Sequence, residues 1–225
     1  KQLKREMTRS RLKPSIASDN VSEGRRAESQ VERILKFWLL PDRGDDARQL
    51  WSRWFVADPE FDKRCRALFL DSYKDAARGR LDGWKETPRS CLALVLLLDQ
   101  FPRNMFRDAV RAFATDAKAR AVSRHAIASG FDRELPHLMR MFFYLPFEHS
   151  EDLNDQMESL RLARALADEY GKSPESAAIL GSAESHLETI RRFRRFPSRN
   201  RALGRHSTKE ELEFLRQANA ASGSE

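Results

Sequence analysis

The chain has 225 residues, of which 40% are hydrophobic and 9% aromatic, so it can bury one substantial core and is not disordered throughout. Its formal net charge is +7, but residues 1–26 hold eight Lys or Arg and three acidic residues, which leaves only +2 for the rest. A nearly neutral body argues against a broad nucleic-acid-binding face. The longest apolar run, residues 91–98, is far shorter than the roughly 20 residues that span a bilayer.

Composition also predicts the domain organisation. We expect a disordered basic extension at 1–27, a single all-helical domain at 28–220 and a disordered tail at 221–225. The extension is rich in Ser, Arg and Lys and does not begin with Met, so an organellar transit peptide, a disordered extension and a truncated start all remain open. Its three acidic residues count against a transit peptide. We therefore expect a cytoplasmic protein, with the organellar matrix as the alternative.

The first predicted helix covers 29–40, because its apolar residues recur with helical spacing before Pro41: Val31, Ile34, Leu35, Trp38 and Leu39. A second helix starts at Asp58-Pro59, an N-cap followed by a first-turn proline, and ends at Gly79. A third starts at Thr87-Pro88 and is apolar on nearly every side through Leu98. A helix of that kind must be enclosed by others, so we predict a central position for it.

The remaining predicted helices have the same kind of boundaries, with a Ser, Thr or Pro at the start and a Pro or Gly at the end. They cover 115–130, 136–145, 150–170 and 173–196, and a last one opens with a capping box at Ser207 and Glu210 or at Thr208 and Glu211. Ser150 is the expected cap of its helix, and Pro146 and Pro197 the expected stops. No two-residue alternation or hairpin signal occurs. We predict an all-α fold of eight or nine helices in stacked antiparallel hairpins, tetratricopeptide-repeat-like but without a clean 34-residue repeat.

Cysteine and metal chemistry are not indicated. Cys65 and Cys91 lie in apolar helical patterns without C-x-x-C spacing, which predicts buried free thiols. No His, Cys and Asp spacing matches a metal site, and no nucleophile motif or glycine-rich phosphate loop occurs. We predict no metal and no cofactor.

A short internal echo marks two candidate site segments, Gln100-Phe-Pro-Arg-Asn104 and Arg195-Phe-Pro-Ser-Arg-Asn200. In a purely structural interpretation, proline stops each helix and the arginine meets free carbonyls at the helix end. In the functional interpretation, both ends project Arg and Asn into one cavity, where planar guanidinium groups bind a carboxylate or phosphate. The sequence leaves both open.

The second copy lies in a basic stretch. Between Thr189 and Lys209 there are seven arginines and no acidic residue. This stretch could contact an anion or RNA, or its arginines could pair with acids elsewhere, such as Glu148, Glu151 and Asp152. Since the body is nearly neutral, we favour pairing for most of them.

Two histidines are candidates for acid–base chemistry. His149 lies between Glu148 and Ser150 at a predicted helix start, and His186 is on the helix that leads to the arginine stretch. An imidazole beside carboxylates could transfer protons on a substrate held by arginine. A buried, hydrogen-bonded histidine without catalytic role is the alternative and the commoner case.

Longer motifs add up to a family resemblance. They are Trp54-Phe55, Asp58-Pro59, Phe61-Asp62, Gly79, Leu81, Trp84, Pro88-Arg89, Leu97-Leu-Asp-Gln-Phe-Pro-Arg-Asn104, Leu145-Pro146, Glu148-His-Ser-Glu151, His186, Ile190, Arg192-Phe193, Leu203-Gly-Arg205, Ser207-Thr208 and Glu211. Over roughly residues 30–218 the chain resembles the bacterial domain of unknown function family 924. The resemblance implies an all-helical, tetratricopeptide-repeat-like fold and no established activity.

The resemblance also implies which segments line a common pocket: 99–104, 148–151 and 186–200. One segment departs from the family pattern Arg-Phe-Gly-Arg-Phe-Pro-His-Arg-Asn, because Arg194 stands in place of the glycine and Ser198 in place of the histidine. A bulky cation could fill the pocket, and loss of the histidine could remove a proton-transfer group, so this member's activity could be altered or lost.

Two functional hypotheses follow. The first is a polar pocket for an anionic small molecule, with His149 or His186 as acid or base. Its candidate ligand-binding residues are Asp99, Gln100, Arg103, Asn104, Glu148, His149, Glu151, His186, Arg192, Arg195, Arg199 and Asn200. The second is a non-catalytic helical scaffold or subunit, which would bind protein or RNA through the basic N-terminal tail and the Arg191–Arg205 stretch.

Overall fold

A computed structural model describes residues 30–40, 51, 53–171 and 173–222 of the chain. The predicted extension 1–27 and most of the predicted tail 221–225 lie outside the described residues. Helices and turns make up the described part, and no strand occurs in it, so the predicted all-α class is confirmed. The likeness to tetratricopeptide repeats stays a prediction.

The first two predicted helices form as expected. Residues 30–39 are helical, and the apolar stripe from Val31 to Leu39 is at most 8% exposed. Helix α3 (Pro59–Ala77) begins after Asp58, whose Oδ1 accepts hydrogen bonds from the amides of Glu60 and Phe61. This cap satisfies two of the amide groups that a helix start leaves without partners.

The centre of the molecule is a long helical run of three segments: α4 (Pro88–Val95), the π-helical turn η2 (Leu96–Gln100) and α5 (Phe101–Met105). Residues 91–98 are completely buried, which confirms the predicted central position. Pro102 does not end this run, contrary to the sequence prediction. It falls in the first turn of α5, where a proline without an N–H is tolerated, because the amide of Phe101 has already closed the wide π turn onto Leu96.

Two further helices cover this central run, α6 (Asp116–Ala128) and α7 (His137–Glu148). Four of the short turns between helices are single 3₁₀ segments, namely η1 (Asp82–Glu86), η3 (Val110–Phe113), η4 (Phe131–Glu134) and η5 (Pro197–Arg199). The prediction that Pro146 stops α7 is wrong. The amide of His149 bonds to the carbonyl of Leu145, which closes the last turn beyond the proline ring, so the helix continues to Glu148.

The next two boundaries also differ from the prediction. Helix α8 (Leu153–Tyr170) is capped by Asp152 and not by Ser150, whose hydroxyl donates to Asp155 instead. Helix α9 (Pro174–Phe193) ends three residues before Phe196, because Arg194 adopts a left-handed conformation with φ 60°. Helix α10 (Lys209–Ser222) opens with the predicted capping box, in which Thr208 and Glu211 bond each other's amides.

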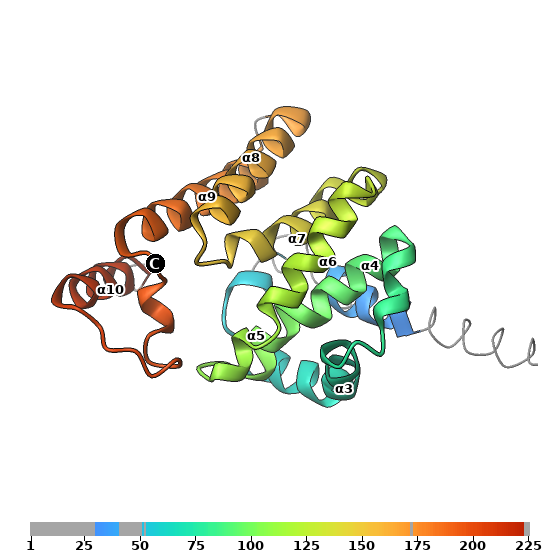
Figure 1. Ribbon diagram of the computed structural model, residues 1–225, viewed down its shortest axis with the longest axis horizontal. Helices are drawn as coiled ribbons and strands as arrows, with labels where there is room; N and C mark the ends of the chain where they lie inside the picture. Colours follow the sequence, from blue (N-terminus) through green and yellow to red (C-terminus); the bar gives the residue numbers. More distant parts are fainter. Residues whose placement is uncertain (1–29, 41–50, 52, 172, 223–225) are drawn as a thin grey trace, which may run out of the picture.

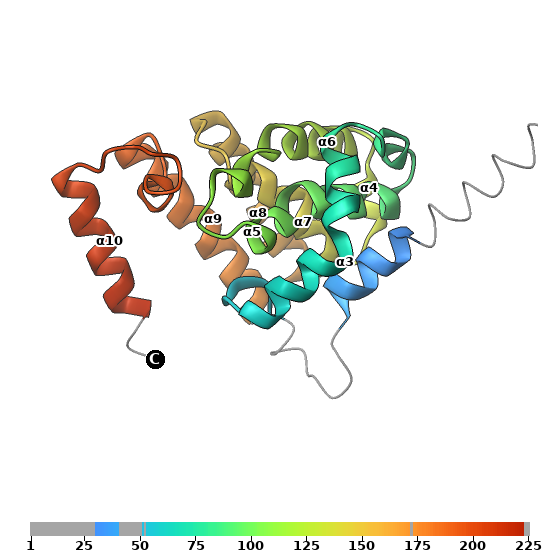
Figure 2. The same ribbon diagram turned by 90° about the horizontal axis from the view of Figure 1, so that it is seen from below.

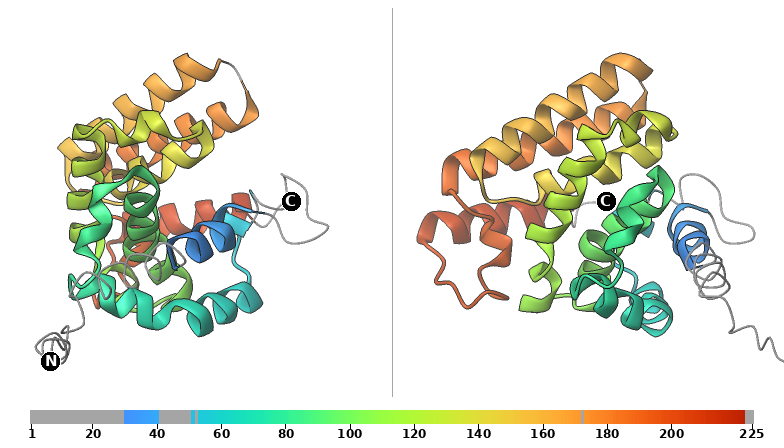
Figure 3. Two further views of the ribbon diagram at one scale, coloured as in Figure 1. Left: turned by 90° about the vertical axis from the view of Figure 1, so that its right-hand side faces the viewer. Right: turned by 45° about the vertical axis from the view of Figure 1, so that its right-hand side comes forward.

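The helices stack as hairpins (Figures 1 and 3). Helices α8 and α9 lie side by side in opposite directions and enclose a small apolar cluster of their own, while α7 packs against α8 and α3 against α5. One large cluster joins the helices from residue 31 to α8, including both cysteines, which are buried free thiols as predicted. Helix α10 stands apart from this bundle and approaches η5 (Figure 2). Among the described helices, none is long and apolar enough to cross a membrane.

Candidate functional site

Two adjoining cavities lie between α7 and α9, the first beside α5 and the second beside α8. The first, of about 240 Å³, is polar and is lined by Trp54, Phe55, Val56, Gln100, Arg103, Asn104, Arg107, Leu145, Glu148, His149, Ser182 and His186. The second, of about 180 Å³, is largely apolar and is lined by Trp51, Phe55, Met141, Tyr144, Leu145, Glu148, Ser159, Ala163, Ala178, Ile179 and Ser182. Four residues line both: Phe55, Leu145, Glu148 and Ser182.

Four chain segments build the polar cavity, and the predicted site residues lie on three of them. The π turn and α5 supply Gln100, Arg103 and Asn104, the end of α7 supplies Glu148 and His149, and α9 supplies His186. A π turn inside a helical run commonly marks a functional site, because it re-aims the side chains around it. Six of the twelve predicted ligand-binding residues therefore line one cavity.

Asp99 holds His149 from behind the cavity wall. Its carboxylate is completely buried and accepts hydrogen bonds from His149 Nδ1 at 2.8 Å and from Gln100 Nε2 at 2.6 Å, with Arg103 Nη1 at 3.3 Å. The neighbouring Arg103 and His149 hold the pKa of this carboxyl well below its usual range. With Nδ1 donating to Asp99, a neutral His149 carries its lone pair on Nε2.

Burial keeps His149 neutral. It lowers the pKa of the imidazole, and the positive charge of Arg103 acts in the same direction. The cluster explains why the nearby carboxylate does not reverse this: Asp99 and Asp116 balance Arg103 and Arg199, so a proton on His149 would leave a net charge in a desolvated site. His149 is therefore a proton acceptor at neutral pH.

The two arginines of the polar cavity each keep one edge without a partner. Arg103 gives both Nη1 protons to the Asp99 carbonyl and Asp116 and one Nη2 proton to Asp116, at 2.6–3.1 Å. Arg107 bonds Asp62 through Nε and Nη2 at 2.8 and 2.9 Å. Among the described residues, nothing accepts a hydrogen bond from Nε or from the second Nη2 proton of Arg103, which together form one edge, or from the Nη1 group of Arg107. A guanidinium edge of this kind fits a carboxylate or phosphate oxygen pair.

The acids that hold these arginines do not line the cavity. Asp62 accepts from Asn104 Nδ2 at 2.7 Å as well as from Arg107, and Asp116 and Asp99 lie on the other side of Arg103. The two arginines thus line the cavity wall, whereas the carboxylates that pair with them lie outside it. This arrangement favours a negative group over a positive one beside the arginines.

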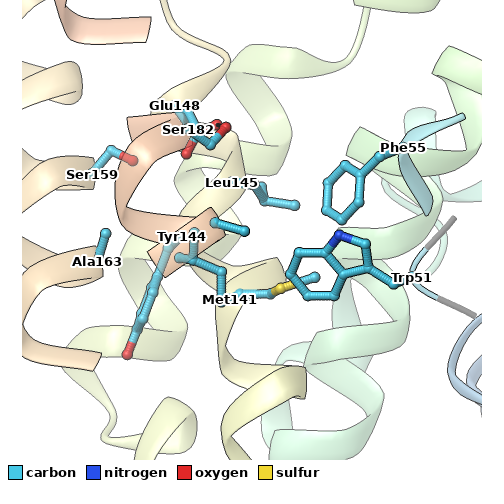
Figure 4. A pocket seen from close by; sticks show the side chains of 11 residues that line it. Trp51, Phe55, Met141, Tyr144, Leu145, Glu148, Ser159, Ala163 and Ser182 are labelled. Carbon is cyan, nitrogen blue, oxygen red and sulfur yellow. Dashed lines mark hydrogen bonds between the residues drawn. The ribbon is translucent and has the colours of Figure 1, made fainter. Parts of the chain in front are cut away.

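Among the described residues, Glu148 is the one acidic residue that lines both cavities. It is 4% exposed, and its Oε1 accepts from Ser182 Oγ at 2.6 Å and lies 3.2 Å from His186 Nδ1. His186 Nδ1 also lies 2.9 Å from the Ser182 carbonyl, so this nitrogen donates, and the ring packs edge-on against Phe196. Figure 4 shows Glu148 and Ser182 together at one end of the apolar cavity.

Four predicted residues lie away from both cavities and hold the segment after α9. Arg195 pairs with Glu211 at 2.6 Å, Asn200 donates to Glu211 and Ser207, and Arg192 pairs with Glu210. Glu151 accepts both bonds of a fork from Arg205 and one from the amide of Phe196. These contacts bear out pairing for most arginines of the basic stretch, although of the three expected acids only Glu151 takes part.

Arg199, the remaining predicted cation, also fails to line the cavity. Its Nη2 donates to the carbonyl of His149 at 2.9 Å, its Nη1 lies 3.6 Å from Asp116, and it stacks between Phe113 and Phe196. Arg103 and Arg199 therefore meet at the carboxylate of Asp116, but Arg199 lies behind His149 and lines neither cavity. The interpretation in which both helix ends project an arginine into one cavity does not hold for Arg199. Arg199 positions the backbone of His149.

Arg194 does not fill the pocket, contrary to the expectation from the family pattern. Its side chain is exposed and lines neither cavity, and its backbone has φ 60° and ψ 9° at the end of α9. Glycine adopts this conformation most readily. The family's glycine therefore fits the helix end, and the change to arginine leaves the cavities as they are. Ser198, at the position of the family's histidine, is exposed and lines neither cavity.

The sequence prediction missed the aromatic and cationic parts of the wall. Trp54, Phe55 and Val56 border the polar cavity, with Phe55 and Val56 more than half exposed, and Arg107 lies in the turn that follows α5. Arg107 belongs to none of the sequence motifs described above. Trp54 and Phe55 stood out only as part of the family resemblance, which did not assign them to the pocket.

The arrangement supplies a base but no paired nucleophile. Ser182, the hydroxyl residue of the polar cavity, donates to Glu148, and within the described wall no hydroxyl is hydrogen-bonded to a histidine side chain. In the described part of the chain no three His, Cys, Asp or Glu side chains are placed to hold a metal ion. Within the described wall, the polar cavity therefore contains a proton acceptor, His149, without a hydroxyl nucleophile bonded to it.

The fold and the site together define an all-helical protein of stacked hairpins with a polar cavity at a π turn. The chain belongs to the family described as "Bacterial protein of unknown function (DUF924)", whose model matches residues 34–219. It is also similar to a solved structure of a protein of unknown function from Agrobacterium tumefaciens, with 38% sequence identity and a TM-score of 0.72 over 85% of this chain and 99% of that one. A search of curated proteins found no match.

Proposed function

We propose that the protein binds an anionic small molecule in the polar cavity. The observation that supports this most is the unpartnered guanidinium edge on both Arg103 and Arg107, whose acids stand behind the wall. Arg103 offers the parallel N–H groups of its Nε/Nη2 edge, and Arg107 offers its Nη1 group, to a carboxylate or phosphate oxygen. His149 and His186 stand beside the bound anion, and Nε2 of neutral His149 can accept a proton from it.

A thermal-shift screen of carboxylated and phosphorylated metabolites tests the proposal. Arg107→Gln is the informative variant, because Arg107 is 43% exposed and bonds only Asp62, whereas Arg103 is part of the buried cluster. Arg161→Gln is the matched control: Arg161 forms the same two-bond fork, with Glu158, on the exposed side of α8 and lines neither cavity. We expect anions that raise the melting temperature of the wild type and of Arg161→Gln to lose at least half of that shift in Arg107→Gln.

The scaffold alternative has less support. Five of the seven arginines in the basic stretch pair with acids, so this surface offers few cations to RNA. Binding of RNA with a steep salt dependence, together with no stabilisation by any anion, would favour the scaffold and contradict the cavity proposal.

A further inference from the structure

We infer that the two cavities form one site for an amphipathic anion, whose charged head bonds Arg103 and Arg107 and whose unbranched hydrocarbon tail occupies the apolar cavity. The inference rests on the proposed anion site and adds to it the class of ligand.

The first ground is continuity. Phe55, Leu145, Glu148 and Ser182 belong to the walls of both cavities, so the two cavities lie side by side and a ligand in the polar cavity can contact Phe55 and Leu145. Figure 4 shows Phe55 and Leu145 facing each other, with Trp51 and Met141 beyond them. A molecule of the polar cavity therefore meets an apolar surface directly beside its head group.

The second ground is the chemistry of the apolar wall. Trp51, Met141 and Ile179 offer no charged group, and the hydroxyl of Tyr144 is already bonded to Asp132 at 2.7 Å. Burial raises the pKa of that tyrosine to about 12, so it stays neutral. Such a wall favours methylene groups over polar ones, since a polar ligand atom there would lose its hydrogen bonds to water.

The third ground is the placement of charge, which determines which end of the ligand lies in which cavity. Glu148 lies between the two cavities, and its carboxylate repels a second negative charge. The cations Arg103 and Arg107 line only the polar cavity. The head therefore lies at the arginine end, and the chain of the ligand passes Glu148 toward Met141 and Ile179.

Isothermal titration of the full chain with straight-chain alkanoates from acetate to dodecanoate, each below its micelle concentration, tests the inference. A parallel series of monoalkyl phosphates separates the two head groups. We expect affinity to rise about fourfold per methylene through the middle of the series and then to level off when the cavity is full.

Two adjacent residues of α9 give a matched pair of variants. Ala177 and Ala178 are both exposed, but only Ala178 lines the apolar cavity. Ala178→Phe should make the affinity level off at a shorter chain, whereas Ala177→Phe should leave the series unchanged. An unchanged series in Ala178→Phe would overturn the assignment of the tail to this cavity.

The outcomes separate this inference from the proposed function. If anion binding does not depend on chain length but Arg107→Gln weakens it, the placement of a hydrocarbon tail in the apolar cavity is contradicted. The proposed anion site then still stands. If alkyl alcohols bind as tightly as alkanoates, the claim that the head group of the ligand is an anion is contradicted. No binding in either series would contradict both.

Discussion

His149 donates its Nδ1 proton to Asp99, 2.8 Å away, across a boundary between the polar cavity and the buried core. The carboxylate lies on the π turn and the imidazole follows the last residue of α7, so one hydrogen bond ties the two elements that form opposite parts of the cavity wall. The position of the His149 imidazole thus depends on the π turn that carries Asp99.

Removing the charge of Asp99 should destabilise the fold. Asp99→Asn leaves Arg103 and Arg199 with Asp116 alone in a desolvated cluster, which we expect to cost about 3 kcal/mol of unfolding free energy. Urea denaturation at pH 7 measures it. Asp71→Asn is the control, because Asp71 is exposed and pairs with Lys74 on the surface of α3; equal losses in the two variants would contradict the cluster.

The lowered pKa of His149 predicts an acid-sensitive fold. The unfolded chain binds a proton on this imidazole at a pKa of about 6.5, whereas the folded protein does not, so stability falls as the pH drops below that value. Between pH 7.5 and 5.5 we expect a loss of about 1 kcal/mol, and His149→Gln should remove most of this loss. If the variant and the wild type lose the same amount, His149 is not the group responsible.

The left-handed backbone at Arg194 predicts a stabilising substitution. Arg194→Gly relieves a conformation that L side chains adopt at a cost, so the unfolding free energy should rise by about 0.5–1 kcal/mol with no effect on ligand binding. Arg191→Gly, inside the last turns of the same helix, should instead lower it by about 1 kcal/mol. A loss of ligand affinity in Arg194→Gly would mean that the site reaches this helix end.

Glu211 should hold α10 and the loop before it in place. It is 2% exposed and accepts hydrogen bonds from Arg195, Asn200 and Thr208, and the Arg195 guanidinium lowers the pKa of its carboxyl to about 2. In Glu211→Gln we expect amide hydrogen exchange in α10 to speed up about tenfold while α8 is unchanged. Glu213→Gln, which removes an exposed pair with Arg216, should leave both helices protected.

Most of the fold could be predicted from the sequence, because periodicity and capping act locally. The stripe from Val31 to Leu39 and the Asp58 cap needed only neighbouring residues. Two of the wrong boundaries share one cause: hydrogen bonds around Pro102 and Pro146 let the helix continue past each proline, and single-residue preferences do not contain those bonds. Helix ends set by a proline depend on where the adjacent amides find acceptors.

Some residues of the site could be predicted from the sequence, but which of the candidate residues line the cavity could not. Arg103 and His149 stood out by type and position, and they do line the cavity. Arg199 and Glu151 have the same residue types, yet a hydrogen bond from Arg199 to the carbonyl of His149 and an ion pair between Glu151 and Arg205, each spanning about fifty positions of sequence, hold them in the structure. Long-range pairing decides which arginines keep a guanidinium edge without a partner, and a single sequence does not show it.

A crystal structure of the full chain with decanoate tests the central claim most directly. We predict the carboxylate within hydrogen-bond distance of the Nε/Nη2 edge of Arg103 and of Arg107 Nη1, with the alkyl chain running past Glu148 to Met141. Decanoate bound elsewhere, or a polar cavity that holds only water at saturating ligand, would contradict the account.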